Sequence, residues 1–236
     1  MKNVLANIGE GPELSDCGIR HVQVATPNPD KVEELQADLK EKGLEAIGLT
    51  AMYLEENTVA TPEAAEAWIS ACDAAVKMGV SLILSSIKAG EELSPKVRDW
   101  LRKMGDEAAK RDITVALETH PSLLHNGDVA LKTMEAVNHE NIKINFDTGN
   151  ISFYTEGADA VTELKKIAKY VVSTHLKEHS GAFQAWEFGT LGTGVVNFAG
   201  IRQVLEGIGF QGPFILQAAG DLKKSVAYLH RLGYGG

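Results

Sequence analysis

The sequence is poor in cysteine and has no long hydrophobic run. Its 236 residues include two cysteines, Cys17 and Cys72, which are too few for a disulfide framework and too far apart for a paired zinc motif. We therefore expect reduced thiols and a cytoplasmic protein. No apolar run approaches the roughly 20 residues of a membrane span, and the first ten residues are too polar for a signal peptide.

Basic residues are also scarce. The chain has 23 Lys and Arg against 32 Asp and Glu, and its formal net charge is −9. An acidic chain without basic clusters binds nucleic acid and anionic membranes poorly, so we expect neither partner. The length and the 44% of hydrophobic residues suit one globular domain over residues 1–236.

Short apolar runs recur along the whole chain. They are rich in Val, Ile and Leu, which is typical of parallel strands that are covered on both faces. The predicted strands cover residues 4–8, 19–25, 44–50, 80–86, 113–119, 142–147, 171–176 and 214–217.

The segments between these runs have helical periodicity. Asn28-Pro29, Thr61-Pro62 and Ser94-Pro95 each place a capping residue before a proline at the first helical position. Eight strands and seven helices in alternation predict an α/β protein with a parallel sheet, most simply a closed (β/α)8 TIM barrel. The predicted helices cover residues 30–42, 63–78, 96–111, 128–137, 158–169, 198–207 and 221–231.

One unit departs from this alternation. Only residues 9–17 join the first two strands, whereas a parallel crossover usually needs about a dozen residues or more. We therefore expect a shortened or missing first helix, unless the first strand lies elsewhere. An open doubly wound sheet is the alternative, but no Gly-rich phosphate-binding motif follows the first strand.

Four side chains with metal-binding chemistry lie at the ends of predicted strands: Glu118, Asp147, His175 and Gln217. Active sites of such barrels lie at the carboxyl ends of the strands, so we expect these side chains to meet at one mouth. Their oxygen and imidazole ligands suit one divalent ion, such as Mn²⁺, Mg²⁺, Co²⁺ or Zn²⁺. A metal would compensate the buried charge of Asp147, as would a helix cap or a lysine partner.

Three stretches resemble the xylose isomerase-like barrel superfamily of sugar-phosphate isomerases and epimerases. They are residues 118–150, which contain ETHP and FDTGN, residues 174–178 (THLKE), and residues 191–217. The family pattern places Glu on the fifth strand, Asp on the sixth, His on the seventh and Glu at the end of the eighth. The resemblance implies that Glu118, Asp147 and His175 are metal ligands and that Gln217 replaces the final Glu.

The resemblance also implies a chemistry, which is proton abstraction next to a metal-polarised carbonyl. Glu118 would be the general base, and Lys177 would stabilise the negative charge that develops. Family epimerases use two carboxylates on opposite faces of the substrate, and Gln217 cannot accept a proton as a carboxylate does. Glu178 and Glu187 are candidate replacements for the missing carboxylate.

Four further residues are predicted to contact substrate: His120, Asn150, Trp186 and Glu187. His120 lies two residues beyond Glu118, although it could instead be a loop histidine bonded to backbone. Asn150 could instead cap a helix, and Trp186 could instead anchor its loop as a buried indole. For Lys177 the alternative is a solvated lysine at a strand exit.

The sequence therefore predicts a divalent-metal-dependent isomerase or epimerase of a small keto-sugar or related carbohydrate. A lyase of the same family, similar to inosose dehydratase, needs only one base and tolerates Gln217 better. A third interpretation is a non-catalytic carbohydrate-binding or partner subunit that has lost a catalytic Glu. Because family members often form dimers or tetramers, the resemblance also implies a homo-oligomer.

Overall fold

The computed structural model describes residues 3–11, 13–90 and 92–235. Eight parallel strands form a closed barrel, in which each strand pairs with the next along the chain and the last pairs with the first. The predicted (β/α)8 barrel is therefore confirmed. The strands are β1 (Leu5–Ile8), β2 (His21–Ala25), β3 (Glu45–Glu55), β4 (Leu82–Lys88), β5 (Thr114–Glu118), β6 (Ile142–Asp147), β7 (Val171–Leu176) and β8 (Phe214–Leu216).

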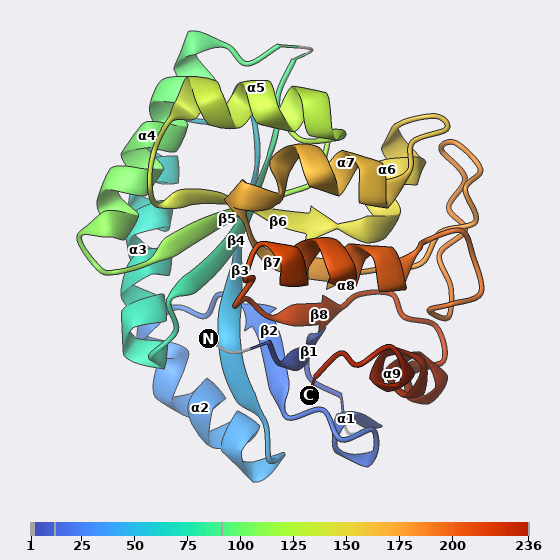
Figure 1. The fold of residues 1–236 in the computed structure, drawn as a ribbon. Coiled ribbons are helices and arrows are strands. Elements are labelled where there is room, and N and C mark those ends of the chain that lie inside the picture. Colours follow the sequence, from blue (N-terminus) through green and yellow to red (C-terminus); the bar gives the residue numbers. More distant parts are fainter. Residues whose placement is uncertain (1–2, 12, 91, 236) are drawn as a thin grey trace.

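Helices surround the barrel (Figure 1). None of the described helices is both long enough and apolar enough to cross a lipid bilayer. The α-helices are α1 (Glu13–Asp16), α2 (Val32–Glu41), α3 (Pro62–Met78), α4 (Pro95–Ala109), α5 (Gly127–Val137), α6 (Thr148–Tyr154), α7 (Ala160–Ile167), α8 (Phe198–Gly207) and α9 (Leu222–Arg231), with 3₁₀ turns at η1 (Pro29–Lys31) and η2 (Ala168–Tyr170).

The first crossover is as short as the sequence predicts. Its helix, α1, is a single turn of four residues. The first strand nevertheless lies where it was placed, because Ala6 pairs with His21 of β2 and Leu5 pairs with Phe214 of β8. A shortened first helix therefore does not open the barrel.

Side-chain hydrogen bonds form at two of the three predicted helix caps. The hydroxyl oxygens of Thr61 and Ser94 accept hydrogen bonds from the backbone N–H groups of Ala64 and Val97. Asn28 lies at the N-cap of the 3₁₀ turn that leads into α2, with Pro29 at its first position as predicted, but its side chain makes no capping hydrogen bond. The position of this cap is therefore confirmed, whereas its hydrogen bond is absent.

Three elements extend beyond the prediction. β3 continues past residue 50 to Glu55, β4 continues past residue 86 to Lys88, and α6 occupies residues for which no element was predicted. All three lie at the carboxyl end of the barrel, where the strand ends carry the candidate residues. These differences therefore alter the walls of the mouth and leave the barrel unchanged.

The barrel interior is apolar low in the barrel and polar near its mouth. Ala6, Ile47 and Ile215 form a buried cluster inside the barrel, separate from the large core between strands and helices. Side chains two residues apart on a strand share a face, so Gln217 faces the interior above Ile215. Position along each strand thus separates the packing layer from the chemical layer.

Candidate active site

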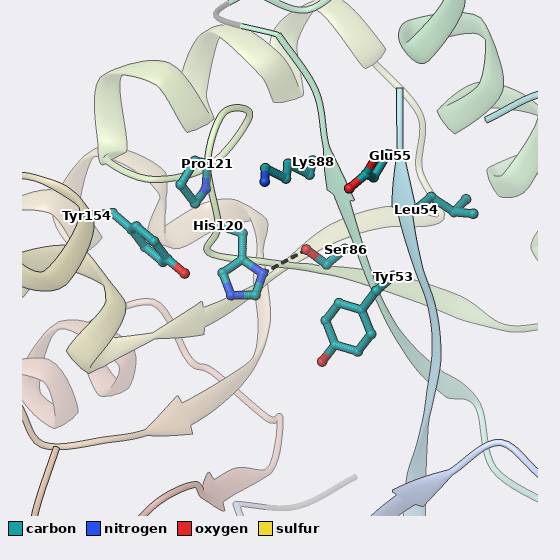
Figure 2. A pocket seen from close by; sticks show the side chains of 8 residues that line it. All are labelled: Tyr53, Leu54, Glu55, Ser86, Lys88, His120, Pro121 and Tyr154. Carbon is teal, nitrogen blue, oxygen red and sulfur yellow. Dashed lines mark hydrogen bonds between the residues drawn. The ribbon is translucent and has the colours of Figure 1, made fainter. Parts of the chain in front are cut away.

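A cavity of about 380 Å³ opens at the mouth beside β3, β4 and β5 (Figure 2). Its size lies in the range of small-molecule sites. Only one of the predicted site residues, His120, lines it. The polar and aromatic residues that line the rest of the cavity are Tyr53, Glu55, Ser86, Lys88 and Tyr154.

His120 connects this cavity to the centre of the barrel. Its Nδ1 lies 2.8 Å from Ser86 Oγ and 3.2 Å from Glu118 Oε2. The ring therefore contacts side chains, and the alternative of a histidine bonded to backbone is wrong. The partly exposed ring places a nitrogen donor or acceptor next to the innermost carboxylate.

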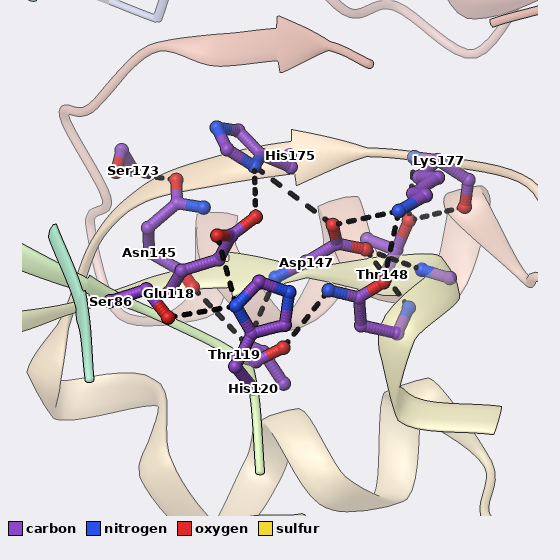
Figure 3. Close-up of polar contacts among 12 residues, drawn as sticks. Ser86, Glu118, Thr119, His120, Asn145, Asp147, Thr148, Ser173, His175 and Lys177 are labelled. Carbon is purple, nitrogen blue, oxygen red and sulfur yellow. Dashed lines mark hydrogen bonds and ion pairs between the residues drawn. The ribbon is translucent and has the colours of Figure 1, made fainter. Parts of the chain in front are cut away.

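Glu118, Asp147 and His175 meet where β5, β6 and β7 end (Figure 3). One ligand atom from each residue lies within 4.8 Å of the others, and all three side chains are buried. His175 Nδ1 is 3.3 Å from Glu118 Oε1 and 3.9 Å from Asp147 Oδ2. The register explains the meeting, because Asp147 pairs with His175 across β6 and β7.

The two carboxylate oxygens of Asp147 have different surroundings. Oδ1 caps α6 by accepting hydrogen bonds from the N–H groups of Gly149 (3.0 Å) and Asn150 (2.9 Å). Oδ2 lies 3.7 Å from Lys177 Nζ and accepts no hydrogen bond. Capping and the lysine pair are therefore both observed, and one oxygen still faces the cluster.

The cluster passes a simple test for a metal site. Buried polar atoms normally have hydrogen-bond partners, yet Glu118 Oε2, Asp147 Oδ2 and His175 Nδ1 have none. Gln217 Oε1 is also buried without a partner. Lone pairs that share one space suit a divalent ion, whose ligands lie at about 2.0–2.2 Å. The residues present therefore fit such an ion.

Burial is the largest influence on both carboxyl groups, and it disfavours their charged forms. It raises the pKa of Asp147 despite the nearby charges of Lys177 and His175. It also acts on Glu118, but the proximity of His175, His120 and Lys177 lowers the pKa of Glu118 overall. Glu118 is thus the carboxyl group that its surroundings keep ionised, as a general base requires.

A hydrogen-bonded chain across the barrel orients His175. Its Nε2–H donates to Gln23 Oε1 at 3.3 Å, and Gln23 Nε2 donates to Thr50 Oγ1 at 2.7 Å. Because the amide oxygen only accepts, Nε2 carries the proton and Nδ1 faces the carboxylates. Such partners of metal-binding histidines fix the tautomer and the ring orientation. No motif in the sequence singles out Gln23, and it was not among the predicted site residues.

Replacing Gln23 should weaken metal binding. We expect Gln23→Leu to lower Mn²⁺ affinity about 10- to 100-fold, because His175 loses the acceptor that fixes its ring. Titration calorimetry on metal-free protein measures this. Gln36→Leu, on the outer surface of α2, is the matched control and should have no effect. Equal affinities for the Gln23 variant and wild type would contradict the proposed role.

Lys177 and Asn150 form a buried network at the edge of the cluster. Lys177 is 7% exposed, and its Nζ donates to Asn150 Oδ1 at 3.0 Å. Asn150 Nδ2 donates to the carbonyl of Thr119, so Asn150 lies inside α6 and does not cap it. The alternatives of a solvated Lys177 and a capping Asn150 are both wrong. Asn150 instead holds the lysine ammonium beside Asp147.

The loop of residues 178–197 forms one wall of the mouth. Trp186 is 78% exposed, and its ring stacks edge-on against Phe153 and Phe188. The alternative of a buried Trp186 anchor is therefore wrong. Glu187 is exposed beside it, whereas Lys177 Nζ lies 4.1 Å from the Phe188 ring centroid. The aromatic group thus covers Lys177 from the solvent side.

Glu178 has a structural task in this loop. It is 1% exposed, and its carboxylate accepts hydrogen bonds from the N–H groups of His179, Gly192 and Val196. The carboxylate is thus engaged with the loop backbone. Glu178 as a replacement base is therefore not supported.

The sequence did not single out the other polar and aromatic residues of this cavity, among them Tyr53, Lys88 and Tyr154. Tyr53 lies on the unpredicted extension of β3, Lys88 ends β4 beyond its predicted limit, and Tyr154 ends the unpredicted α6. The only available signal was the run AMYLE after residue 50, which continues the strand. Errors in element ends therefore led directly to missed site residues.

Comparison with known proteins bears on this geometry. Among curated proteins, L-ribulose-5-phosphate 3-epimerase UlaE of Salmonella paratyphi A is 28% identical over 142 residues, which are 59% of this chain and 48% of UlaE. The chain thus spans about half the length of the curated relatives it matches.

Solved structures share the fold. A xylose isomerase domain protein from Planctomyces limnophilus has a TM-score of 0.74 and 23% identity, over 99% of this chain and 96% of that one. The probable 3-DHS dehydratase AsbF from Bacillus anthracis has a TM-score of 0.73 and 18% identity, over 98% and 99%. The family model of the xylose isomerase-like TIM barrel matches residues 12–232. The chain therefore belongs to the xylose isomerase-like TIM barrel family.

Proposed function

We propose that this chain is a divalent-metal-dependent enzyme that isomerises or epimerises a small keto-sugar or related carbohydrate. The observation that carries the proposal is the buried cluster of Glu118, Asp147 and His175, whose facing atoms have no hydrogen-bond partners. Family membership and the similarity to a sugar-phosphate epimerase support it. A single domain, a homo-oligomer and a cytoplasmic location remain predictions.

Each residue has a definable task in this proposal. A divalent ion held by Glu118, Asp147, His175 and Gln217 would supply Lewis-acid polarisation of a substrate carbonyl. Glu118 takes the proton from the neighbouring carbon, because its carboxylate is ionised and lies in the cluster beside the polarised carbonyl. Lys177 places a positive charge beside Asp147.

The remaining predicted contacts belong to the walls of the mouth. His120 would bond substrate hydroxyls from the cavity side, whereas Trp186 and Glu187 would contact substrate from the loop side. Asn150 acts through Lys177, because its amide oxygen accepts a hydrogen bond from the Lys177 ammonium. These assignments suit a hydroxyl-rich ligand, because they combine an aromatic face with polar groups.

Gln217 favours a second candidate, a lyase that eliminates water or another group next to the same carbonyl. Elimination needs one base and one acid, and here one base, Glu118, has an imidazole, His120, as its neighbour. Two-base epimerisation would need a second proton acceptor on the opposite face, where an amide cannot serve. The fold similarity to a dehydratase is compatible with this candidate.

Metal content and hydrogen exchange test the proposal together. We expect about one equivalent of Mn, Mg, Co or Zn per chain by elemental analysis after purification without chelator. In D₂O, the metal-loaded protein should exchange the C–H proton next to the carbonyl of a ketose, observed by NMR, and EDTA should stop this exchange. Loss of water from the ligand would favour the lyase. Metal-free protein that exchanges no ketose proton even with added Mn²⁺ would leave the binding-subunit interpretation.

A further inference from the structure

The cavity beside β3, β4 and β5 has no task in the proposed reaction. It adjoins the cluster through His120 and Tyr53, which both interact with Glu118. On the side of the 178–197 loop, Lys177 packs against the Phe188 ring, which contacts Phe153. The cavity therefore offers room for the other end of a substrate whose reacting carbons lie beside Glu118.

The charges on the rim of the cavity cancel. Glu55 ends β3 and Lys88 ends β4, and the two residues pair in register across these strands. Figure 2 shows both side chains on the rim beside Ser86. Among the described residues that line the cavity, Lys88 is the one cation and none is an arginine. Planar arginine forks are a frequent means of binding phosphate, and the described lining of this cavity has none.

Glu55 also places a carboxylate where a terminal phosphate would lie. A dianionic group at the rim would meet this carboxylate beside the single ammonium of Lys88.

The lining instead suits hydroxyl groups on a carbon skeleton. The Tyr53 and Tyr154 rings flank His120, with ring centroids 6.4 Å and 5.6 Å from the imidazole. Ser86 Oγ and the His120 ring supply hydrogen-bonding groups at the base of the cavity. Aromatic walls with a few polar groups are typical of sites for small neutral ligands.

We propose that this cavity is the subsite for the uncharged, hydroxyl-bearing end of the substrate, and that Glu55 makes the site select free over phosphorylated ketoses. The inference rests on the proposed function and narrows its substrate class. It also separates this chain from UlaE, whose name specifies a phosphorylated sugar.

The test compares L-ribulose with L-ribulose 5-phosphate, which differ only by the phosphate. Titration calorimetry on Mn²⁺-loaded protein should give the lower Kd for L-ribulose with wild type. Glu55→Lys changes the rim by two charges and should shift the ratio of the two Kd values about tenfold towards the phosphate. Glu45→Lys makes the same change at the opposite end of β3 and should leave the ratio unaltered.

Inorganic phosphate provides a readout that is independent of catalysis. Titration calorimetry on metal-free protein should show binding of inorganic phosphate to Glu55→Lys and none to wild type. Tighter binding of L-ribulose 5-phosphate by wild type would overturn the inference while leaving a metal-dependent epimerase in place. An unchanged Kd ratio in Glu55→Lys, or binding of neither ketose, would also overturn it. Failure of the proposed function is seen separately, as absence of metal and of proton exchange.

Discussion

Glu118→Gln is expected to lower ketose-dependent exchange of the C–H proton with solvent by about 10²- to 10⁴-fold, the usual contribution of a positioned general base. The amide keeps the size and one oxygen of the side chain but accepts no proton. His175 and His120, which both lie close to the carboxylate, would keep their positions. NMR measurement of deuterium uptake at saturating Mn²⁺ gives the ratio of rates.

The saturating metal is essential to this comparison, because the variant also loses a charged ligand. Metal content should therefore be determined on the same sample. Glu118→Asp keeps the charge and shortens the side chain, so it should retain more exchange than Glu118→Gln if proton transfer matters. A Glu118→Gln variant that binds metal and exchanges protons at the wild-type rate would refute the assignment of Glu118 as base.

Glu178→Ala should cause a large loss in the free energy of unfolding. The carboxylate satisfies the N–H groups of His179, Gly192 and Val196, and all three lose their partner in the variant. The N–H groups of His179 and Val196 are buried, whereas that of Gly192 is only partly buried. Each buried donor left unsatisfied costs about 1–3 kcal/mol, so we expect a fall of about 2 kcal/mol or more in the free energy of unfolding. Urea unfolding followed by circular dichroism measures the loss.

Glu187→Ala is the matched control, since Glu187 belongs to the same loop but is exposed. Its effect should stay within about 0.5 kcal/mol, as is usual for surface positions. Glu178→Gln should fall between the two, because the amide retains one acceptor oxygen. If Glu178→Ala were as stable as wild type but had lost proton exchange, Glu178 would be a catalytic residue and not a loop anchor.

The barrel could be predicted because its signals are local. Parallel strands covered on both faces produce nearly continuous apolar runs such as residues 113–117, and a polar residue at the end of such a run, here Glu118, marks the mouth. Glu118, Asp147 and His175 were found in this way, since register places adjacent strand ends together. Asp147 also shows what local signals leave undetermined. The hydrogen bond that its carboxylate accepts from the N–H group of Gly149 shows that it caps α6, and this contact cannot be read from the sequence.

The rest of the site depends on contacts that no local pattern encodes. Gln23 and His175 are 152 positions apart and meet only because the barrel closes. The exposure of Trp186 follows from how a long loop places its ring against Phe153 and Phe188. The identity of the side chain alone could not distinguish an exposed indole from a buried one. The wall residue Tyr53 required the true end of β3, and strand ends are set by pairing with neighbours.

The two carboxylate oxygens of Asp147 couple the folding of the first turn of α6 to binding at the metal cluster. One oxygen stabilises the turn, and the other faces the cluster. Any ligand that binds the second oxygen in the native state and not in the unfolded chain adds its binding free energy to folding. The site is therefore coupled to local order: occupancy rigidifies the turn, and fraying of the turn weakens occupancy by the same free energy.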